Sequence, residues 1–327
     1  MSYSANIMRL ARQELARRKE DSQSQYRQRI QEAYNKVPRL RQIDLELRRT
    51  MTRAAQTVFA GGGDAVAVME QAKQENLALQ QERKTLEEKY FTPGYLEEKP
   101  ICDRCGGSGY LGVGMCRCLH SLCIAEQKKE LARLCTGYEK FENFRLDLYS
   151  DRTDPVMGVS PRAVMERTFQ LCLNYARDFQ PGAANLLFNG FTGLGKTFLS
   201  ACIAESVADK GFSVVYESAP KLFTKLEKNR FEPTEQTRSD MDAIMGCDLL
   251  IIDDLGTEMP GNFVTAALYA LLNDRLLENK SMLISTNLNA DEIVARYSGQ
   301  IASRLLGSFK ILTFVGQDIR ILKNRGL

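Results

Sequence analysis

The 327-residue sequence has no apolar run that approaches the ~20 residues of a membrane-spanning helix. Its first residues, Met1 to Ser4, lead into charged positions instead of the apolar core of a signal peptide. Internal repeats and low-complexity tracts are also absent. These absences argue against a membrane protein and predict a cytoplasmic location.

The composition is that of a globular chain, with 44% hydrophobic and 26% charged residues. The formal net charge of +3 hides an asymmetry, because residues 1–60 contain 13 Lys or Arg against 6 Asp or Glu. A basic front end suggests an anionic partner, although a solvated basic helix face is the commoner meaning of such a pattern. The length suffices for one sizeable core with smaller attachments.

Residues 1–91 predict a helical N-terminal region. Two helices meet near Val37-Pro38, glycines 61–63 interrupt the pattern, and Asp64 can cap a third helix that runs to about Tyr90. A helical hairpin and a coiled-coil-like pair both fit this segment, but clean heptads are absent. The region is either a docking module for a partner or a plain helical domain, and both interpretations stay open.

Residues 92–140 are predicted to form a small metal-binding module. Five of the nine cysteines fall within 22 residues, which indicates a metal site before disulfides. Two close cysteine pairs around a glycine-rich turn can supply the four thiolates of a tetrahedral zinc site. The predicted ligands are Cys102, Cys105, Cys116 and Cys118, with His120, the only histidine, or Cys123 as substitutes. Four thiolates leave no open position, so the zinc would be structural; a redox disulfide and buried free thiols are the alternatives.

A different pattern follows a predicted linker over residues 141–160. Ser160 can cap a helix that Pro161 starts and that runs to about Phe179. Apolar strands then alternate with helices, which predicts an α/β fold with a parallel sheet covered by helices over residues 161–327. The predicted strands are 185–189, 213–217, 248–253, 282–286 and 311–315.

The segment Gly190–Thr197 (GFTGLGKT) has the pattern G-x-x-x-x-G-K-[ST], in which backbone N–H groups surround nucleotide phosphates. A short apolar strand precedes it and an apolar-faced helix follows, which is the setting that the motif requires. Lys196 would reach the β- and γ-phosphates, and the Thr197 hydroxyl would ligate Mg²⁺. The sequence therefore predicts an ATP site, formed by Gly190, Thr192, Gly193, Leu194, Gly195, Lys196, Thr197 and Phe198. An ordinary glycine-rich turn is the weaker alternative.

Two acids and an amide follow later strands of the predicted sheet. Asp253 ends a buried apolar run and would hold Mg²⁺ through water beside Thr197, while Asp254 would orient the attacking water. A helix cap or a turn is the alternative for such an acid pair. Asn287 lies at the polar tip of the next strand and can hydrogen-bond the γ-phosphate or the water. Together these residues predict Mg²⁺-dependent ATP hydrolysis.

The order of these motifs resembles the AAA+ ATPases, and more narrowly the bacterial helicase-loader family DnaC/DnaI with the transposition helper IstB. The resemblance rests on GFTGLGKTFLSACIA (190–204), LLIIDDLGTE (249–258), LISTNL (283–288), IASRL (301–305) and GQDIR (316–320). It covers residues 141–327, whereas residues 1–90 match the family in position only. It implies an AAA+ P-loop core with a reduced or absent helical lid, because Leu327 follows soon after the last strand.

The resemblance also implies a task and partners. The protein would bind single-stranded DNA and deliver the hexameric replicative helicase under the control of ATP. Its N-terminal region would grip the helicase, and its ATPase domains would assemble as a ring or spiral. Arg304 would act on the γ-phosphate of a neighbouring subunit, although such an arginine taken alone is more often a surface salt-bridge residue. Arg320 is the candidate for the sensor-2 position.

The helix after the second strand is a candidate DNA contact, since cations track phosphates and aromatic rings stack on bases. It carries Lys221, Lys225, Lys228 and Arg230 together with Phe223 and Phe231. A solvated helix with core phenylalanines is an equally good interpretation. The alternative function is a transposition helper that acts with a transposase on target DNA; the zinc module and the long N-terminal region favour the loader. A metabolic P-loop kinase fits the acid pair and the later motifs poorly.

Overall fold

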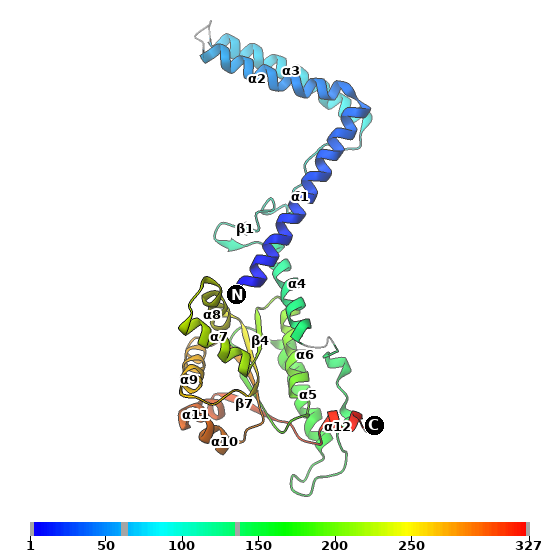
Figure 1. Cartoon of the computed structure of the whole chain (residues 1–327). Coiled ribbons are helices and arrows are strands. Elements are labelled where there is room, and N and C mark those ends of the chain that lie inside the picture. Colours follow the sequence, from blue (N-terminus) through cyan, green and yellow to red (C-terminus); the bar gives the residue numbers. More distant parts are fainter. Residues whose placement is uncertain (1–2, 60–64, 135–137, 325–327) are drawn as a thin grey trace. The chain divides into compact units, whose positions relative to one another are not determined.

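The structure is a computed structural model that describes residues 3–59, 65–134 and 138–324. The chain forms two compact units (Figure 1): an α/β unit, Met1–Gln13 with Met115–Leu327, and a helical unit, Glu14–Gly114. These limits differ from the predicted domains, because the first residues of the chain pack with the α/β core. Within the described residues, no helix combines the length and the apolarity that a membrane span needs.

The α/β unit is built on a sheet of five parallel strands in the order β4-β5-β6-β3-β7. The strands are β3 (Asn185–Asn189), β4 (Val214–Ser218), β5 (Leu249–Leu255), β6 (Ser281–Thr286) and β7 (Phe309–Thr313). Leu187 of β3 stands opposite Ile284 of β6 and Ile311 of β7. The predicted parallel sheet is confirmed, and no strand end is displaced by more than two residues from its predicted position.

Helices cover both faces of this sheet. They are α4 (Arg117–Leu134), α5 (Pro161–Asp178), α6 (Lys196–Asp209), α7 (Ala219–Phe231), α8 (Glu235–Gly246), α9 (Asn262–Leu277), α10 (Ala290–Arg296), α11 (Gly299–Gly307) and α12 (Ile319–Asn324). Leu249 and Ile251 of β5 join the apolar cluster under α5 and α6, whereas Leu250 and Ile252 join the cluster under α7 to α11 (Figure 1). Burial on both faces explains why β5 is apolar at successive positions.

Arg275 of α9 is a fully buried cation, at 0% exposure. Its guanidinium donates to the carbonyls of Ile244, Cys247 and Ser281 at 2.7, 3.2 and 2.8 Å. The first two carbonyls lie at the C-terminal end of α8, where the helix dipole favours a positive charge. Arg275 therefore joins α9 to the end of α8 and to the start of β6.

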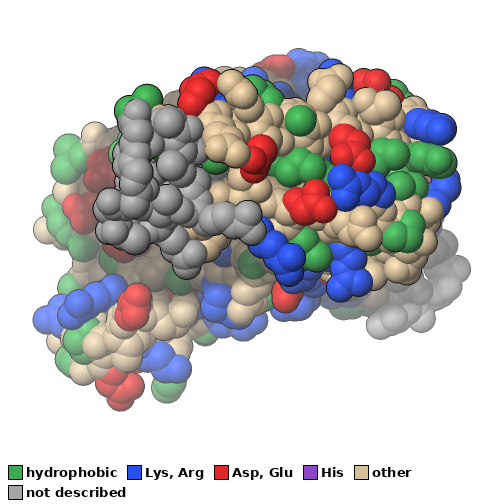
Figure 2. All heavy atoms as spheres, turned by 90° about the horizontal axis from the view of Figure 1, so that it is seen from above, with side chains coloured by type: hydrophobic (Ala, Val, Ile, Leu, Met, Phe, Trp, Pro, Cys, Tyr) green, Lys and Arg blue, Asp and Glu red, His purple; other side chains and the backbone are tan. Residues whose placement is uncertain are grey.

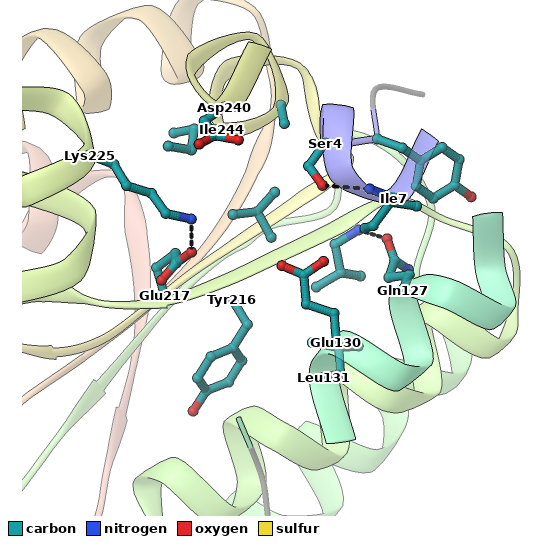
Figure 3. A pocket seen from close by; sticks show the side chains of 14 residues that line it. Ser4, Ile7, Gln127, Glu130, Leu131, Tyr216, Glu217, Lys225, Asp240 and Ile244 are labelled. Carbon is teal, nitrogen blue, oxygen red and sulfur yellow. Dashed lines mark hydrogen bonds and ion pairs between the residues drawn. The ribbon is translucent and has the colours of Figure 1, made fainter. Parts of the chain in front are cut away.

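The start of the chain and α4 pack against β4. The Tyr3 hydroxyl donates to the backbone before β4 at 3.3 Å, and Gln127 of α4 hydrogen-bonds the backbone on either side of Ser213. A small cavity remains between these segments, α7 and α8 (Figure 3). Lys225 of α7 points into it and forms an ion pair with Glu217 of β4. These contacts place the first residues of the chain in the α/β unit.

The helical unit contains the rest of α1 (Ala5–Lys36), α2 (Pro38–Phe59) and α3 (Ala65–Tyr90). A short two-stranded sheet of β1 (Tyr110–Leu111) and β2 (Gly114–Met115) follows these helices in the chain. Because α2 begins at Pro38, the predicted junction of two helices is confirmed. The predicted glycine break at 61–63 and the predicted cap at Asp64 lie outside the described residues.

Arginine–carboxylate contacts join α2 to α3. Among the described residues, Ala33, Val37 and Leu40 are the buried members of an apolar cluster in this unit, and Ile43 of α2 is buried as well. Arg39 donates to both carboxylate oxygens of Glu82 at 2.8 and 2.9 Å, and Arg83 donates to Asp44 at 2.9 Å. On the face that Figure 2 shows, Lys and Arg side chains are interspersed with Asp and Glu. Such a mixture is typical of a solvated helix surface.

Candidate functional site

The predicted phosphate loop connects β3 to α6. Gly190 has φ +151°, and a Cβ at this position would lie 2.4 Å from the carbonyl oxygen of Phe314, so only glycine fits. Gly195, with φ +90°, is the N-cap of α6, which begins at Lys196. The first N–H groups of α6 therefore face the loop, in the arrangement that binds an anion at a helix N-terminus.

Lys196 is 4% exposed and lies within this loop. Its ammonium donates to two carbonyls of the loop at 2.6 and 2.7 Å, and to Oδ1 of Asn287 at 2.7 Å. Burial lowers the pKa of Lys196, while the nearby charges of Asp254 and Asp253 act in the opposite direction. The structure thus brings the loop lysine against the predicted Asn287, at the end of the neighbouring strand β6.

A cavity of about 320 Å³ opens beside Lys196. Thr192–Phe198 line it together with Asp254, Asn287 and Arg320. Of the other residues predicted for the site, Gly190, Asp253 and Arg304 are not among the lining residues. The cavity has the size of a small-molecule site and lies at the carboxyl ends of the parallel strands, where α/β proteins bind their ligands.

Two hydroxyl groups fix the carboxylate of Asp253, which is 6% exposed. The Tyr216 hydroxyl donates to Oδ2 at 3.0 Å, and the Ser285 hydroxyl donates to Oδ1 at 2.5 Å. Ser285 also accepts the backbone N–H of Asp254 at 2.8 Å, so it holds both acids. Hydroxyl and carboxylate oxygens, here those of Thr197 and Asp253, are ligands that Mg²⁺ prefers, and an already engaged carboxylate suits contact through water.

Asp254 stands at an irregular point of β5. Its φ is +55°, and the pairing with β6 shifts register between Ile252 and Leu255. Burial raises the pKa of Asp254, and the charge of Asp253 raises it further, whereas Lys196 and Arg320 lower it. Left-handed backbone at a non-glycine residue concentrates at functional sites. The geometry therefore favours the functional interpretation of the acid pair over a simple turn.

Aromatic side chains from the predicted linker and from Tyr138, just before it, complete the cavity wall. Tyr138, Phe144 and Tyr149 are among the lining residues. Tyr149 is 1% exposed, and its hydroxyl donates to the carbonyl of Leu194 at 2.9 Å. Phe144 stacks on Phe169 of α5 with ring centroids 5.2 Å apart. Residues 141–160 therefore contribute to the site, and the signal in the sequence is the presence of four aromatic residues between 138 and 149.

Arg304 lies on α11, outside the cavity of its own chain. It donates to the Tyr269 hydroxyl and to Oδ1 of Asn273, both at 2.9 Å, and its guanidinium lies 4.3 Å from the centre of the Tyr269 ring. These partners, both on α9, are a phenol and an amide. The contacts hold the Arg304 side chain in a defined orientation. A residue that acts on the nucleotide of another subunit needs such an orientation, but a surface residue without that role can have it too.

The candidate DNA helix, α7, divides into inward and outward side chains. Phe223 is 4% exposed and belongs to the core, and Lys225 forms its ion pair with Glu217 (Figure 3). The exposed residues are Lys221, Lys228, Arg230 and Phe231. The guanidinium of Arg230 lies 5.8 Å from the centre of the Phe231 ring. The outward set combines cations with one exposed aromatic ring.

The four predicted zinc ligands lie together. The sulfurs of Cys102, Cys105, Cys116 and Cys118 are all within 4.8 Å of one another. The N–H of Gly109 donates to the sulfur of Cys105 at 3.3 Å, a contact that stabilises a thiolate. The proposed substitutes are engaged elsewhere: Nε2 of His120 lies 3.0 Å from a backbone carbonyl, and Cys123 is buried against Met8. This donor set fits a tetrahedral zinc ion.

Comparison with known proteins places the core among nucleotide-binding relatives. Residues 171–309 match the family model described as IstB-like ATP binding protein. An insertion sequence IS232 putative ATP-binding protein of Bacillus thuringiensis subsp. berliner is 30% identical over 142 residues, 42% of this chain and 56% of that protein. The replicative helicase loader DnaC of Escherichia coli K12 is 22% identical over 134 residues, 40% of this chain and 54% of that protein.

A crystal structure of the DnaC helicase loader matches with a TM-score of 0.45 and 19% identity, over 54% of this chain and 98% of that chain. The chain spans about half the length of the curated relatives that it matches. Residues 171–309, which the family model matches, contain the phosphate loop, the acid pair and Arg304.

Proposed function

We propose that the protein hydrolyses ATP and uses the cycle to load a replicative DNA helicase onto single-stranded DNA in the cytoplasm. The match of residues 171–309 to the family model described as IstB-like ATP binding protein supports the ATP-dependent part of this proposal. The observation that carries the ATPase assignment is the convergence of Lys196, Asp254 and Asn287 on one cavity. These three side chains come from the phosphate loop and from the ends of two neighbouring strands, so the fold assembles the site.

Each residue has a distinct task in this proposal. Lys196 and the N–H groups of α6 hold the phosphates, and Asn287 keeps the lysine in place through its 2.7 Å hydrogen bond. Thr197 and Asp253 hold Mg²⁺, which neutralises phosphate charge when it is bound. Asp254 orients the attacking water. The aromatic wall of Tyr138, Phe144 and Tyr149 suits the flat face of a nucleobase.

The partners follow from the relatives and from the surface of α7. Curated relatives are named replicative helicase loaders, DnaC and DnaI. Exposed Lys228, Arg230 and Phe231 offer charge for a DNA backbone and a ring for a base. The helical unit would dock the helicase, the cysteine cluster would hold a structural zinc ion, and Arg304 would act on the nucleotide of a second copy in a ring or spiral.

The test of the loader function is a pull-down of the replicative helicase from the same cell with the full-length protein, with and without ATP. Binding that depends on ATP and is altered in Lys196→Ala supports the proposal. Single-stranded DNA should stimulate hydrolysis by the wild type. Failure to retain the helicase in either nucleotide state, with the zinc content and the fold intact, would contradict a loader.

The second candidate is a transposition helper, which the 30% identity to an insertion sequence protein favours. The two candidates differ in their partner. A helper would bind a transposase and duplex target DNA, whereas a loader would bind the helicase and single strands. Parallel pull-downs with a helicase and with a transposase encoded in the same genome separate them, and the helical unit is the reason to place the loader first.

A further inference from the structure

Glu258 is a buried carboxylate that the nucleotide site described above does not use. It is 4% exposed and follows β5 in the connection to α9. A carboxylate removed from water has to be stabilised by hydrogen bonds or by a cation. The partners of Glu258 therefore show which parts of the unit it joins.

Both carboxylate oxygens of Glu258 accept hydrogen bonds, and their donors come from two different parts of the chain. Oε2 accepts the N–H of Gly256 at 2.9 Å, in the turn that directly follows Asp254. Oε1 accepts the hydroxyl of Tyr297 and, at 3.3 Å, the Nε–H of Arg296. Arg296 also donates to the backbone carbonyl of Glu258. One side chain thus ties the turn beside the acid pair to the junction of α10 and α11.

The helix that starts at this junction carries Arg304. α11 spans nine residues, Gly299–Gly307, and has Arg304 in its last turn. The far end of the helix is attached to α9 by the hydrogen bonds of Arg304 to Tyr269 and Asn273. A displacement of the turn at Gly256 would therefore reach Arg304 through one carboxylate and one short helix.

We propose that Glu258 is a positioning residue that couples the nucleotide site of its own chain to Arg304. The inference rests on the proposed function, in which Arg304 serves the nucleotide of a neighbouring copy. A change at Asp254 alters the turn at Gly256, Glu258 passes the change to α11, and Arg304 moves at the next site. Hydrolysis in one subunit thereby depends on the nucleotide state of the subunit that supplies the arginine.

The test uses Glu258→Gln, which keeps the size and the acceptor for the Gly256 N–H but removes the charge beside Arg296. Turnover at saturating ATP should fall by about tenfold to a hundredfold, the effect of a small misplacement of a reacting group. The KM for ATP and the ATP affinity in a direct binding assay should stay unchanged. Tyr297→Phe, which removes a single hydroxyl, should lower turnover in the same direction by a smaller factor.

Asp248→Asn is the matched control. Asp248 is also buried, at 5% exposure, and accepts the N–H and the hydroxyl of Ser213 at 2.8 and 2.7 Å, but it lies at the opposite end of β5. It should lower the Tm of the α/β unit without lowering turnover at a temperature where the protein is folded. A loss of turnover in Glu258→Gln and Asp248→Asn that merely follows Tm would show that Glu258 is structural and would overturn the proposal.

Mixing experiments locate the effect. Lys196→Ala subunits contain Glu258 and Arg304. At an ATP concentration high enough to fill their weakened site, they should restore part of the turnover of Glu258→Gln, as they should for Arg304→Ala. Reduced turnover in Glu258→Gln without restoration would place the residue at its own site and would overturn the coupling. Wild-type turnover by Arg304→Ala would instead contradict the proposed role of that arginine, so the two failures are distinguishable.

Discussion

The interactions that stabilise the α/β unit internally differ from those that stabilise the helical unit internally. In the α/β unit, apolar residues from five strands and their covering helices form two buried clusters, one on each face of the sheet. In the described part of the helical unit, the buried apolar residues include Ala33, Val37, Leu40 and Ile43, and arginine–carboxylate contacts join α2 to α3. Apolar burial does not depend on the screening of charges and depends little on pH, whereas exposed ion pairs respond to both.

This difference indicates which parts of the protein keep a fixed conformation and which can rearrange. A core buried on both faces of a sheet holds the ends of its strands in fixed positions, which a constellation of catalytic side chains needs. A helix pair with few buried contacts opens locally at low cost and can rearrange on a partner. The nucleotide site is accordingly built on the α/β unit, and a docking role suits the helical unit.

The largest effect is expected from the core of the sheet. Phe188 is 0% exposed and its ring centre lies 4.9 Å from that of Phe314. Phe188→Ala should destabilise the α/β unit by about 3–5 kcal/mol, because a cavity remains where the ring was. Leu40→Ala, the matched change in the helical unit, should cost about 2 kcal/mol, at the low end of its class. Calorimetry that resolves two transitions checks both values, and equal losses would break the comparison.

The next effect concerns the ligand. Lys196→Ala removes the cation that we propose contacts the phosphates, and ATP affinity should fall by about tenfold to a hundredfold, since hydrogen bonds to charged groups contribute roughly 1.5–3 kcal/mol. ATP should raise the Tm of the α/β transition in the wild type and not in the variant, while the helical transition stays in place. A shift of both transitions by ATP would mean that the two units respond to the nucleotide together.

A smaller effect is expected from the polar contacts of the helical unit. Arg83→Gln removes a cation that contacts Asp44 and Glu87, and it should lower the stability of α2 and α3 by about 1 kcal/mol or less. Salt at about 1 M, where the screening length is roughly 3 Å, should reduce the difference between the variant and the wild type. A loss that is independent of salt would point to packing instead of charge.

Acid should produce the smallest change, with a defined sign. Arg39 holds the pKa of Glu82 below its ordinary value of about 4.5, mainly through its hydrogen bonds to that carboxylate. A depressed carboxylate pKa stabilises the folded state above the unfolded value, and this contribution is lost as the pH falls from about 4.5 through the lowered pKa. Helicity of the wild type and of Glu82→Gln should therefore differ at neutral pH and converge in acid.

Much of the α/β unit is predictable from the sequence because its signals are local. The apolar runs give the strands, and the phosphate loop gives Lys196, whose contact with Asn287 follows from the parallel sheet. The aromatic wall is not predictable in this way, because Tyr149 and Phe144 reach the cavity through contacts that depend on the path of the chain. The same reason hides Tyr216 and Ser285, which hold Asp253 and come from other strands.

The direction in which a side chain points is also not predictable from the composition of its helix. Phe223 and Lys225 have the composition of a nucleic-acid contact, yet Phe223 is buried in the core and Lys225 forms an ion pair with Glu217 of β4. The cysteine cluster is the opposite case: close pairs on either side of a tight turn bring four sulfurs together with little help from the rest of the chain. A site can be predicted from the sequence when its residues lie close together along the chain.

The buried hydrogen bonds of Arg275 affect how the results of a mutagenesis scan of this protein should be interpreted. A lysine cannot reproduce a guanidinium that donates to several carbonyls at once, and a neutral side chain would leave those carbonyls buried without donors. Saturation mutagenesis should therefore find position 275 about as intolerant of change as the phosphate loop. An arginine that never varies is easily taken for the one that a neighbouring subunit uses. Here Arg275 is sealed inside its own chain, whereas Arg304 is partly exposed and is the arginine proposed above to serve a second copy.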